Sequence, residues 1–172
     1  MAVCLDCGDT LVDEATEIRN EQGVVQRAEL IPGAADMVRA LKRRGYKLAL
    51  VADGPASTFY NILTAHQLLP LFDALAISEE VGVDKPDARM FVHALSRLGI
   101  TPENYGRTVM VGNHLTRDIK GANQLGLISV WLDWSPRRAK IPAEATEIPR
   151  YTIKTPAELL PLLEVLENKR QA

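Results

Sequence analysis

Short apolar runs alternate with amphipathic stretches along the chain, and glycine or proline marks most of the boundaries between them. Short apolar runs are typical of buried strands, and amphipathic stretches are typical of helices. Their alternation predicts an α/β fold: a three-layer, Rossmann-like sandwich with a central parallel sheet of five or six strands. Strands are expected at Ala2–Asp6, Tyr46–Ala52, Ala74–Ser78, Arg107–Gly112 and Leu127–Leu132, with a sixth candidate at Tyr151–Lys154.

The amphipathic stretches carry the start and stop signals of helices. Helices are expected at about Gly33–Arg44, after Pro55, at about Asp87–Leu98, at Thr116–Leu125 and from Thr155 onward. Thr155 and Glu158 have the spacing of a capping box. The longest irregular segments are Val12–Ile31 and Asp133–Arg150, and long loops in compact α/β domains are often functional.

The 172 residues are enough for one full core and few for two, which predicts a single domain over 1–172 with a short flap at about 12–31. The formal net charge is −2 and charges of both signs are interspersed, so nucleic-acid binding is not expected. The sequence shows no long apolar span and no leader pattern, which predicts a cytoplasmic protein without a membrane segment.

Cys4 and Cys7 have the CxxC spacing of some redox and zinc sites. A redox pair belongs at a helix N-terminus and a zinc site needs further ligands, and neither condition is met. Residues three apart on a strand face opposite sides, so two separate buried thiols are predicted.

Polar residues follow three of the predicted strands. Asp6 ends the first, Asp53 and Gly54 end the second, and Asn113 follows the fourth. Ligands of such sheets bind at the carboxyl ends of the strands, near the point where the strand order reverses. These residues are therefore expected to share one site.

Three segments resemble motifs of the haloacid dehalogenase-like (HAD) hydrolase superfamily, and the resemblance extends over about residues 2–132. Cys4-Leu5-Asp6-Cys7-Gly8-Asp9-Thr10-Leu11 is similar to the nucleophile motif Asp-x-Asp-x-Thr. Val83-Asp84-Lys85-Pro86-Asp87 is similar to the lysine motif, and the segment from Val111 to Ala122 is similar to the acidic motif. Their order and spacing make a specific signal, which implies a HAD-like core and phosphate-ester hydrolysis.

The resemblance implies a role for each matching residue. Asp6 would be the nucleophile that forms an aspartyl-phosphate, supported by Lys85 and Thr10, because a carboxylate that attacks a phosphate needs positive charge nearby. Mg²⁺ would be the cofactor, since it prefers oxygen ligands. The residues implied for the metal are Asp6, the backbone carbonyl of Gly8, Asn113 and Asp118. Those expected around the phosphate or substrate are Asp53, Gly54 and His114.

The chain departs from the family pattern at three positions. Gly8 stands where the family has the aspartate that acts as general acid and base. Ala52 replaces a hydroxyl residue that would contact the phosphate, and Asn113 replaces a metal-ligating aspartate. Asp9 and His114 are two candidates for the missing proton transfer, while the alternative for Asp9 is a turn aspartate that bonds nearby backbone.

Further charges lie in the two long irregular segments. Asp13 and Glu14 could line the entrance of the site, and Arg137 and Arg138 could reach a substrate. The favoured interpretation of both pairs is as solvated loop charges.

The resemblance also implies a cap-less or minimal-cap protein, because the flap and the Gly54–Lys85 segment leave no room for a cap domain. An open site suits a large phosphorylated substrate or a phosphoprotein, or a homo-oligomer in which a neighbouring subunit covers it. Two alternatives stay open beside a Mg²⁺-dependent phosphohydrolase. One is a degenerate HAD domain that binds a phosphorylated ligand or protein partner without turnover, and the other is a different Asp-nucleophile hydrolase such as a dehalogenase.

Overall fold

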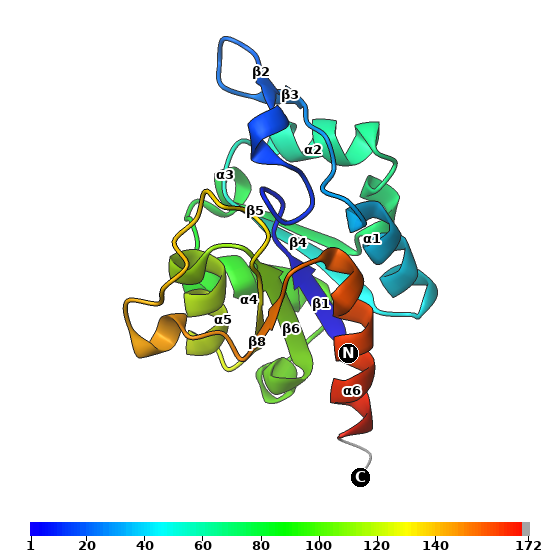
Figure 1. Cartoon of the computed structure of the whole chain (residues 1–172), viewed down its shortest axis with the longest axis vertical. Coiled ribbons are helices and arrows are strands. Elements are labelled where there is room, and N and C mark those ends of the chain that lie inside the picture. The colour runs from blue at the N-terminus through cyan, green and yellow to red at the C-terminus, as the bar shows by residue number, and fades with distance from the viewer. Residues whose placement is uncertain (170–172) are drawn as a thin grey trace.

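A computed structural model describes residues 1–169 of the chain (Figure 1). Its centre is a six-stranded sheet in which all neighbouring strands are parallel. The strands are β1 (Ala2–Leu5), β4 (Lys47–Ala52), β5 (Ala74–Ile77), β6 (Thr108–Gly112), β7 (Ile128–Leu132) and β8 (Tyr151–Ile153), in the spatial order β5-β4-β1-β6-β7-β8. The predicted α/β class is confirmed, and all six predicted strands are present.

Helices cover both faces of this sheet. They are α1 (Ala34–Arg43), α2 (Ala56–Ala65), α3 (Ser78–Val81), α4 (Ala88–Arg97), α5 (Lys120–Gln124) and α6 (Leu159–Asn168). Because successive strand residues face opposite sides, Val3 and Leu5 of β1 pack with α1, α2 and α6, while Ala2 and Cys4 pack with α4 and α5. Cys7 belongs to the first cluster, so the two free cysteines are buried in different cores, as predicted.

The segment between β1 and α1 forms a flap at the carboxyl end of the sheet (Figure 1). It contains a 3₁₀ turn, η1 (Glu14–Thr16), and an antiparallel hairpin of β2 (Ile18–Arg19) and β3 (Val25–Arg27). The hairpin is tied to α2, because the Val25 N–H donates to Thr58 Oγ1 at 3.0 Å and Asn61 Nδ2 donates to the Val25 carbonyl at 3.0 Å. Strands of two and three residues leave no periodic pattern, which explains why this segment was predicted as irregular.

The predicted helix at Thr116–Leu125 is the main difference from the sequence expectation. A π-helical turn, η4 (Leu115–Ile119), comes first, and regular α-helix follows only in α5. The expected capping box is present: Glu158 accepts from the Thr155 N–H at 2.9 Å before α6 begins. The remaining 3₁₀ turns are η2 (Leu69–Leu71), η3 (Pro102–Arg107), η5 (Ala145–Glu147) and η6 (Pro156–Glu158).

The order of the strands places the site. From β1 the chain moves outward through β4 and β5, and it then crosses back to β6 on the other side of β1. Ligands of such sheets bind at the carboxyl ends of the strands beside this reversal. Within residues 1–169, none of the helices has the length and apolar character needed to cross a membrane.

Candidate active site

Asp6 is the first residue after β1 and it opens a tight loop. Its N–H still donates to the Val111 carbonyl at 3.0 Å, so the sheet fixes its backbone. The Cys7 carbonyl accepts three N–H groups from the next turn, including that of Thr10 at 3.2 Å. This turn brings Thr10 Oγ1 within 3.3 Å of Asp6 Oδ2, to which it donates a hydrogen bond. Asp6 is only 8% exposed.

Lys85 lies at the centre of the site, and its ammonium group is fully enclosed. Nζ donates to Asp6 Oδ1 at 2.6 Å, to Asp118 Oδ1 at 2.7 Å and to the Val51 carbonyl at 2.8 Å. Burial lowers the pKa of Lys85, but the Asp118 and Asp6 carboxylates outweigh it and hold the pKa above its usual range. Lys85 is therefore a permanent positive charge beside Asp6.

Asp118 reaches the site from the π turn. Its Oδ2 accepts from the His114 N–H at 2.9 Å, which folds the side chain back toward β6. A Cβ atom on Gly112 would lie 2.3 Å from Asp118 Cγ, so only glycine allows this close approach. Burial and the neighbouring Asp6 raise the pKa of Asp118. The π turn thus serves to aim a buried carboxylate at Lys85.

Asp53 supports Lys85 from the end of β4. Its Oδ1 accepts from the Lys85 N–H at 2.9 Å, and its Oδ2 pairs with Arg117 Nη1 at 3.2 Å. Both carboxylate oxygens are thus used within the protein, and burial raises the pKa of this group. Through these contacts Asp53 positions Lys85. Direct binding of phosphate by Asp53 stays a prediction.

Asn113, His114 and Gly54 complete the cleft that contains Asp6 and Lys85. Asn113 is 3% exposed, and its Nδ2 has no hydrogen-bond partner among residues 1–169. The His114 ring is half-buried, and burial lowers its pKa. The Gly54 N–H donates to Ser78 Oγ at 2.9 Å, which orders the turn after β4.

Asp9 is fully buried behind the loop and does not line the cleft. Its carboxylate pairs with Arg137, and its Oδ1 accepts from the Glu14 N–H at 3.2 Å. Burial raises the pKa of Asp9, but the hydrogen bonds from Arg137 and Ser135 outweigh it, so the pKa lies below its ordinary value. Of the two roles that the sequence left open, these surroundings match the turn aspartate.

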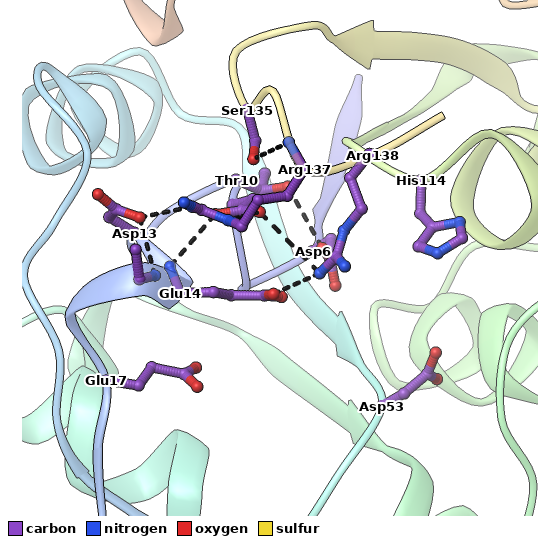
Figure 2. Close-up of polar contacts among 12 residues, drawn as sticks. Asp6, Thr10, Asp13, Glu14, Glu17, Asp53, His114, Ser135, Arg137 and Arg138 are labelled. Atoms are coloured by element: carbon purple, nitrogen blue, oxygen red, sulfur yellow. Dashed lines mark hydrogen bonds and ion pairs between the residues drawn. The ribbon is translucent and has the colours of Figure 1, made fainter. Parts of the chain in front are cut away.

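Two loops far apart in sequence meet at the rim of the cleft (Figure 2). Arg137 pairs with Asp9 and Asp13, and Arg138 pairs with Glu14. Their prediction as solvated charges is therefore wrong, because these side chains neutralise one another across the two loops. Neither loop has a repeating pattern that would reveal the pairing, and the only signal was their unusual length.

The residues predicted for a metal can be tested against the site. Asp6, Gly8, Asn113 and Asp118 all line the same cleft, and together they offer only oxygen donors apart from the Asn113 amide nitrogen. Among the described residues, no group of three or more His, Cys, Asp or Glu side chains is placed to hold a metal. A magnesium ion here would thus depend in part on neutral oxygens, namely the Gly8 carbonyl and Asn113 Oδ1. The unpartnered atom of Asn113 is Nδ2, which is a donor and is not a ligand for the metal.

Comparison with known proteins identifies the family to which this chain belongs. The haloacid dehalogenase-like hydrolase model matches residues 6–126. The chain is 33% identical to a glyceraldehyde 3-phosphate phosphatase of Methanopyrus kandleri over 78% of its own length and 57% of the relative's. It is 36% identical to a phosphoserine phosphatase of Thermus thermophilus over 63% of its length and 42% of the relative's. The chain therefore belongs to the haloacid dehalogenase-like hydrolase family.

The solved structures agree with this fold. The HAD-hydrolase YfnB of Bacillus subtilis, bound to magnesium, superposes with a TM-score of 0.78 over 94% of this chain and 97% of that chain, at 21% identity. The chain spans about half the length of the curated relatives it matches. The family match over residues 6–126 spans the nucleophile, lysine and acidic motifs from Asp6 to Ala122.

Proposed function

We propose that the chain is a Mg²⁺-dependent phosphohydrolase that cleaves phosphate esters through an aspartyl-phosphate on Asp6. The observation that carries the proposal is the Asp6 carboxylate at the mouth of the cleft, held by Lys85 at 2.6 Å and by Thr10. The two curated relatives compared above are named as phosphatases of glyceraldehyde 3-phosphate and of phosphoserine. A small phosphorylated metabolite is the substrate class that these names support.

The geometry of Asp6 suits a nucleophile. Lys85 holds Oδ1, while Oδ2 receives only the long hydrogen bond from Thr10 and is the freer oxygen. Attack of Oδ2 on phosphorus forms the aspartyl-phosphate and breaks the ester bond, whose electrons leave with the alcohol oxygen. Water then attacks the phosphorus, which releases inorganic phosphate and restores the Asp6 carboxylate. Lys85 offsets the negative charge that gathers in both steps.

Magnesium supplies positive charge to the phosphate oxygens when it is bound. Asp6, the Gly8 carbonyl and Asn113 are the residues that would hold it, with Asp118 orienting a water ligand. Asp6 and Asp118 carry two negative charges, and Lys85 cancels one of them. The chain should therefore bind magnesium weakly until a substrate phosphate adds its own oxygens.

The cleft is open in the residues that the structure describes. Between β1 and α1 the flap contains only η1 and the β2–β3 hairpin, so we propose a minimal cap and a single domain over 1–172. Such a site admits a substrate that is larger than the cleft, or it is covered by a second copy of the chain. No stripe of positive charge points to nucleic acid as a partner.

The test is hydrolysis of p-nitrophenyl phosphate by the wild type and by Asp6→Asn, each with Mg²⁺ and with a chelator. We expect turnover that requires the metal and falls by at least about 10³-fold in Asp6→Asn. Asp36→Asn is the matched control, because Asp36 is exposed on α1. Turnover that survives in Asp6→Asn would overturn the proposal.

One second candidate has a specific observation in its favour. Gly8 and Ala52 lack the side chains that the family uses for proton transfer and phosphate contact. A domain that binds a phosphorylated ligand without turnover would bind inorganic phosphate. Its rate of p-nitrophenyl phosphate hydrolysis would be the same in the wild type and in Asp6→Asn. Metal-independent release of halide from a haloacid would instead indicate a dehalogenase.

A further inference from the structure

Position 8 has no side chain, yet the space beside it is filled. A Cβ atom built on Gly8 would lie 2.2 Å from Glu14 Oε1, 3.0 Å from Glu14 Cδ and 3.1 Å from Glu14 Cγ. Real Cβ atoms essentially never approach other atoms this closely, so a side chain at position 8 and Glu14 in this conformation exclude each other. The Glu14 carboxyl group therefore occupies the space into which a side chain at position 8 would project.

Several contacts hold Glu14 in this place. Asp13 caps η1, and its side chain accepts from the Ala15 N–H at 2.9 Å. The Glu14 N–H is bound by Asp9, and Arg138 pairs with Oε2. Figure 2 shows the Glu14 side chain extending from the flap toward Arg138 and Asp6. Glu14 is thus fixed at its backbone and at one carboxylate oxygen.

The other oxygen is left for the cleft. Glu14 lines the same cleft as Asp6 and Lys85. Its Oε1 has no hydrogen-bond partner among the residues that the structure describes, whereas Oε2 is held by Arg138. A carboxyl group with one free oxygen can both donate and accept a proton.

We propose that Glu14 is the general acid and base of the phosphohydrolase, in place of the side chain that Gly8 lacks. This inference rests on the proposed function. In the first step Asp6 Oδ2 bonds to phosphorus, the ester bond breaks, and the departing alcohol oxygen takes the proton from Glu14 Oε1. In the second step the Glu14 carboxylate takes a proton from the attacking water, which releases inorganic phosphate and frees Asp6.

The leaving group distinguishes this role from a structural one. An aryl oxygen departs without much need for a proton, whereas an alkyl oxygen needs one, and general acid catalysis contributes about 10²–10⁴ in rate. Glu14→Gln keeps the shape and removes the proton. We expect it to lower kcat on an alkyl phosphate such as glycerol 2-phosphate by about 10²-fold or more.

The aryl substrate separates the two steps. With p-nitrophenyl phosphate, we expect Glu14→Gln to release a rapid burst of about one nitrophenol per active site and then to turn over slowly, because the aspartyl-phosphate forms but hydrolyses without a base. Glu21→Gln is the matched control, since Glu21 is exposed at the tip of the same flap. It should behave as the wild type on both substrates.

Moving the carboxylate from position 14 to position 8 tests whether the two side chains can occupy the same space in the cleft. Glu14→Ala alone should lose alkyl-phosphate turnover as Glu14→Gln does. The double variant Gly8→Asp/Glu14→Ala, which frees the space and fills it from position 8, should regain turnover to within about tenfold of the wild type. Rescue by relocation is a result that a merely structural role of Glu14 would not give.

The possible results distinguish a failure of the proposed role of Glu14 from a failure of the proposed phosphohydrolase function. If Asp6→Asn hydrolyses aryl phosphate as well as the wild type, the proposed function is wrong and the role of Glu14 is wrong with it. If turnover depends on Asp6 but Glu14→Gln retains alkyl-phosphate activity, or loses the aryl burst as well, only the role of Glu14 is overturned.

Discussion

Two charged clusters lie at the cleft, and they are built in different ways. The lysine cluster consists of Lys85, Asp6 and Asp118, whose side chains are 2%, 12% and 1% exposed. Its members come from the loop after β1, the loop after α3 and the π turn η4, all at the carboxyl end of the sheet. The arginine cluster consists of Arg137 and Arg138 with Asp9, Asp13 and Glu14, and all of these side chains except that of Asp9 are between 27% and 34% exposed.

The difference shows how the proposed reaction is divided. The sheet fixes the nucleophile and its positive charge, and the contact between two loops fixes the group that moves the proton. Charges buried at a distance from water interact more strongly than charges at a wet rim. The stability of the lysine cluster should therefore depend less on salt concentration, and more on substitution of its cation, than that of the arginine cluster.

The largest expected effect comes from Lys85→Met. This change leaves Asp6 and Asp118 buried without their cation, so the free energy of unfolding at pH 7 should fall by about 3 kcal/mol. Turnover should fall by about 10³-fold as well. Urea denaturation and p-nitrophenyl phosphate hydrolysis measure the two losses.

Lys154→Met provides the comparison, because Lys154 is 65% exposed and pairs with Asp133. Its removal should cost no more than about 0.5 kcal/mol. Similar losses for the two lysines would mean that burial of an ion pair does not raise the cost of removing its cation.

A smaller effect is expected for Arg137→Met in the arginine cluster. Asp9 would stay buried without a cation, but Arg137 is 34% exposed and water can replace part of its contact. The free energy of unfolding should fall by about 2 kcal/mol.

The double variant Arg137→Met/Asp9→Asn should recover part of this loss, because asparagine is neutral and tolerates the positive φ of 50° at position 9. Arg89→Met, at an exposed pair with Asp87, is the control. A double variant as unstable as the single one would show that the loss does not come from the unpaired Asp9.

Arg138→Met should affect the reaction more than the fold. It releases Glu14 Oε2, and a misplaced acid should lower kcat on an alkyl phosphate by about tenfold. The first release of nitrophenol from p-nitrophenyl phosphate should be as fast as in the wild type, because that step needs no acid. Unchanged kcat on the alkyl phosphate would mean that Glu14 keeps its place without the arginine.

The smallest effect is expected at Asp133, which anchors the loop that carries both arginines. Lys140 and Lys154 outweigh its desolvation and hold its pKa below the ordinary value. A lowered pKa stabilises the fold at every pH above the ordinary value near 4, and this contribution is lost as pH falls through the lowered pKa.

The wild type should therefore be more stable than Asp133→Asn at pH 7, and the difference should shrink as the pH falls below about 4. Thermal unfolding of both proteins over this range measures it. A difference that grows as the pH falls would contradict the direction of the shift.

Much of the fold could be predicted because the sheet leaves a periodic record in the sequence. The first strand was expected at Ala2–Asp6 and extends over Ala2–Leu5, with Asp6 just beyond it. The hairpin of β2 and β3 was missed because such short strands carry no alternation. The π turn was missed because Leu115–Ile119 keeps the composition of a helix while its hydrogen bonds change.

The site residues near the sheet could be predicted from the sequence, whereas those of the irregular loops could not. Asp6, Asp53 and Asn113 were expected together because strand ends meet at one edge of a parallel sheet, and all three line the cleft. Lys85 and Asp118 were expected there from the family resemblance, and Lys85 contacts both Asp6 and Asp118. Glu14 was interpreted as a solvated charge because its partner Arg138 lies 124 residues away in an irregular loop. The glycine at position 8 was the available signal, since an absent side chain leaves room for another.

The three hydrogen bonds of Lys85 limit what this residue offers to a ligand. An ammonium group has three protons, and here two go to carboxylates and one to the Val51 carbonyl. Lys85 therefore has no free N–H to donate to a phosphate in the cleft. It acts on the phosphate through its positive charge alone, which favours no particular orientation. Recognition by direction, which separates one phosphorylated compound from another, must then come from backbone amides and from the loops around the rim.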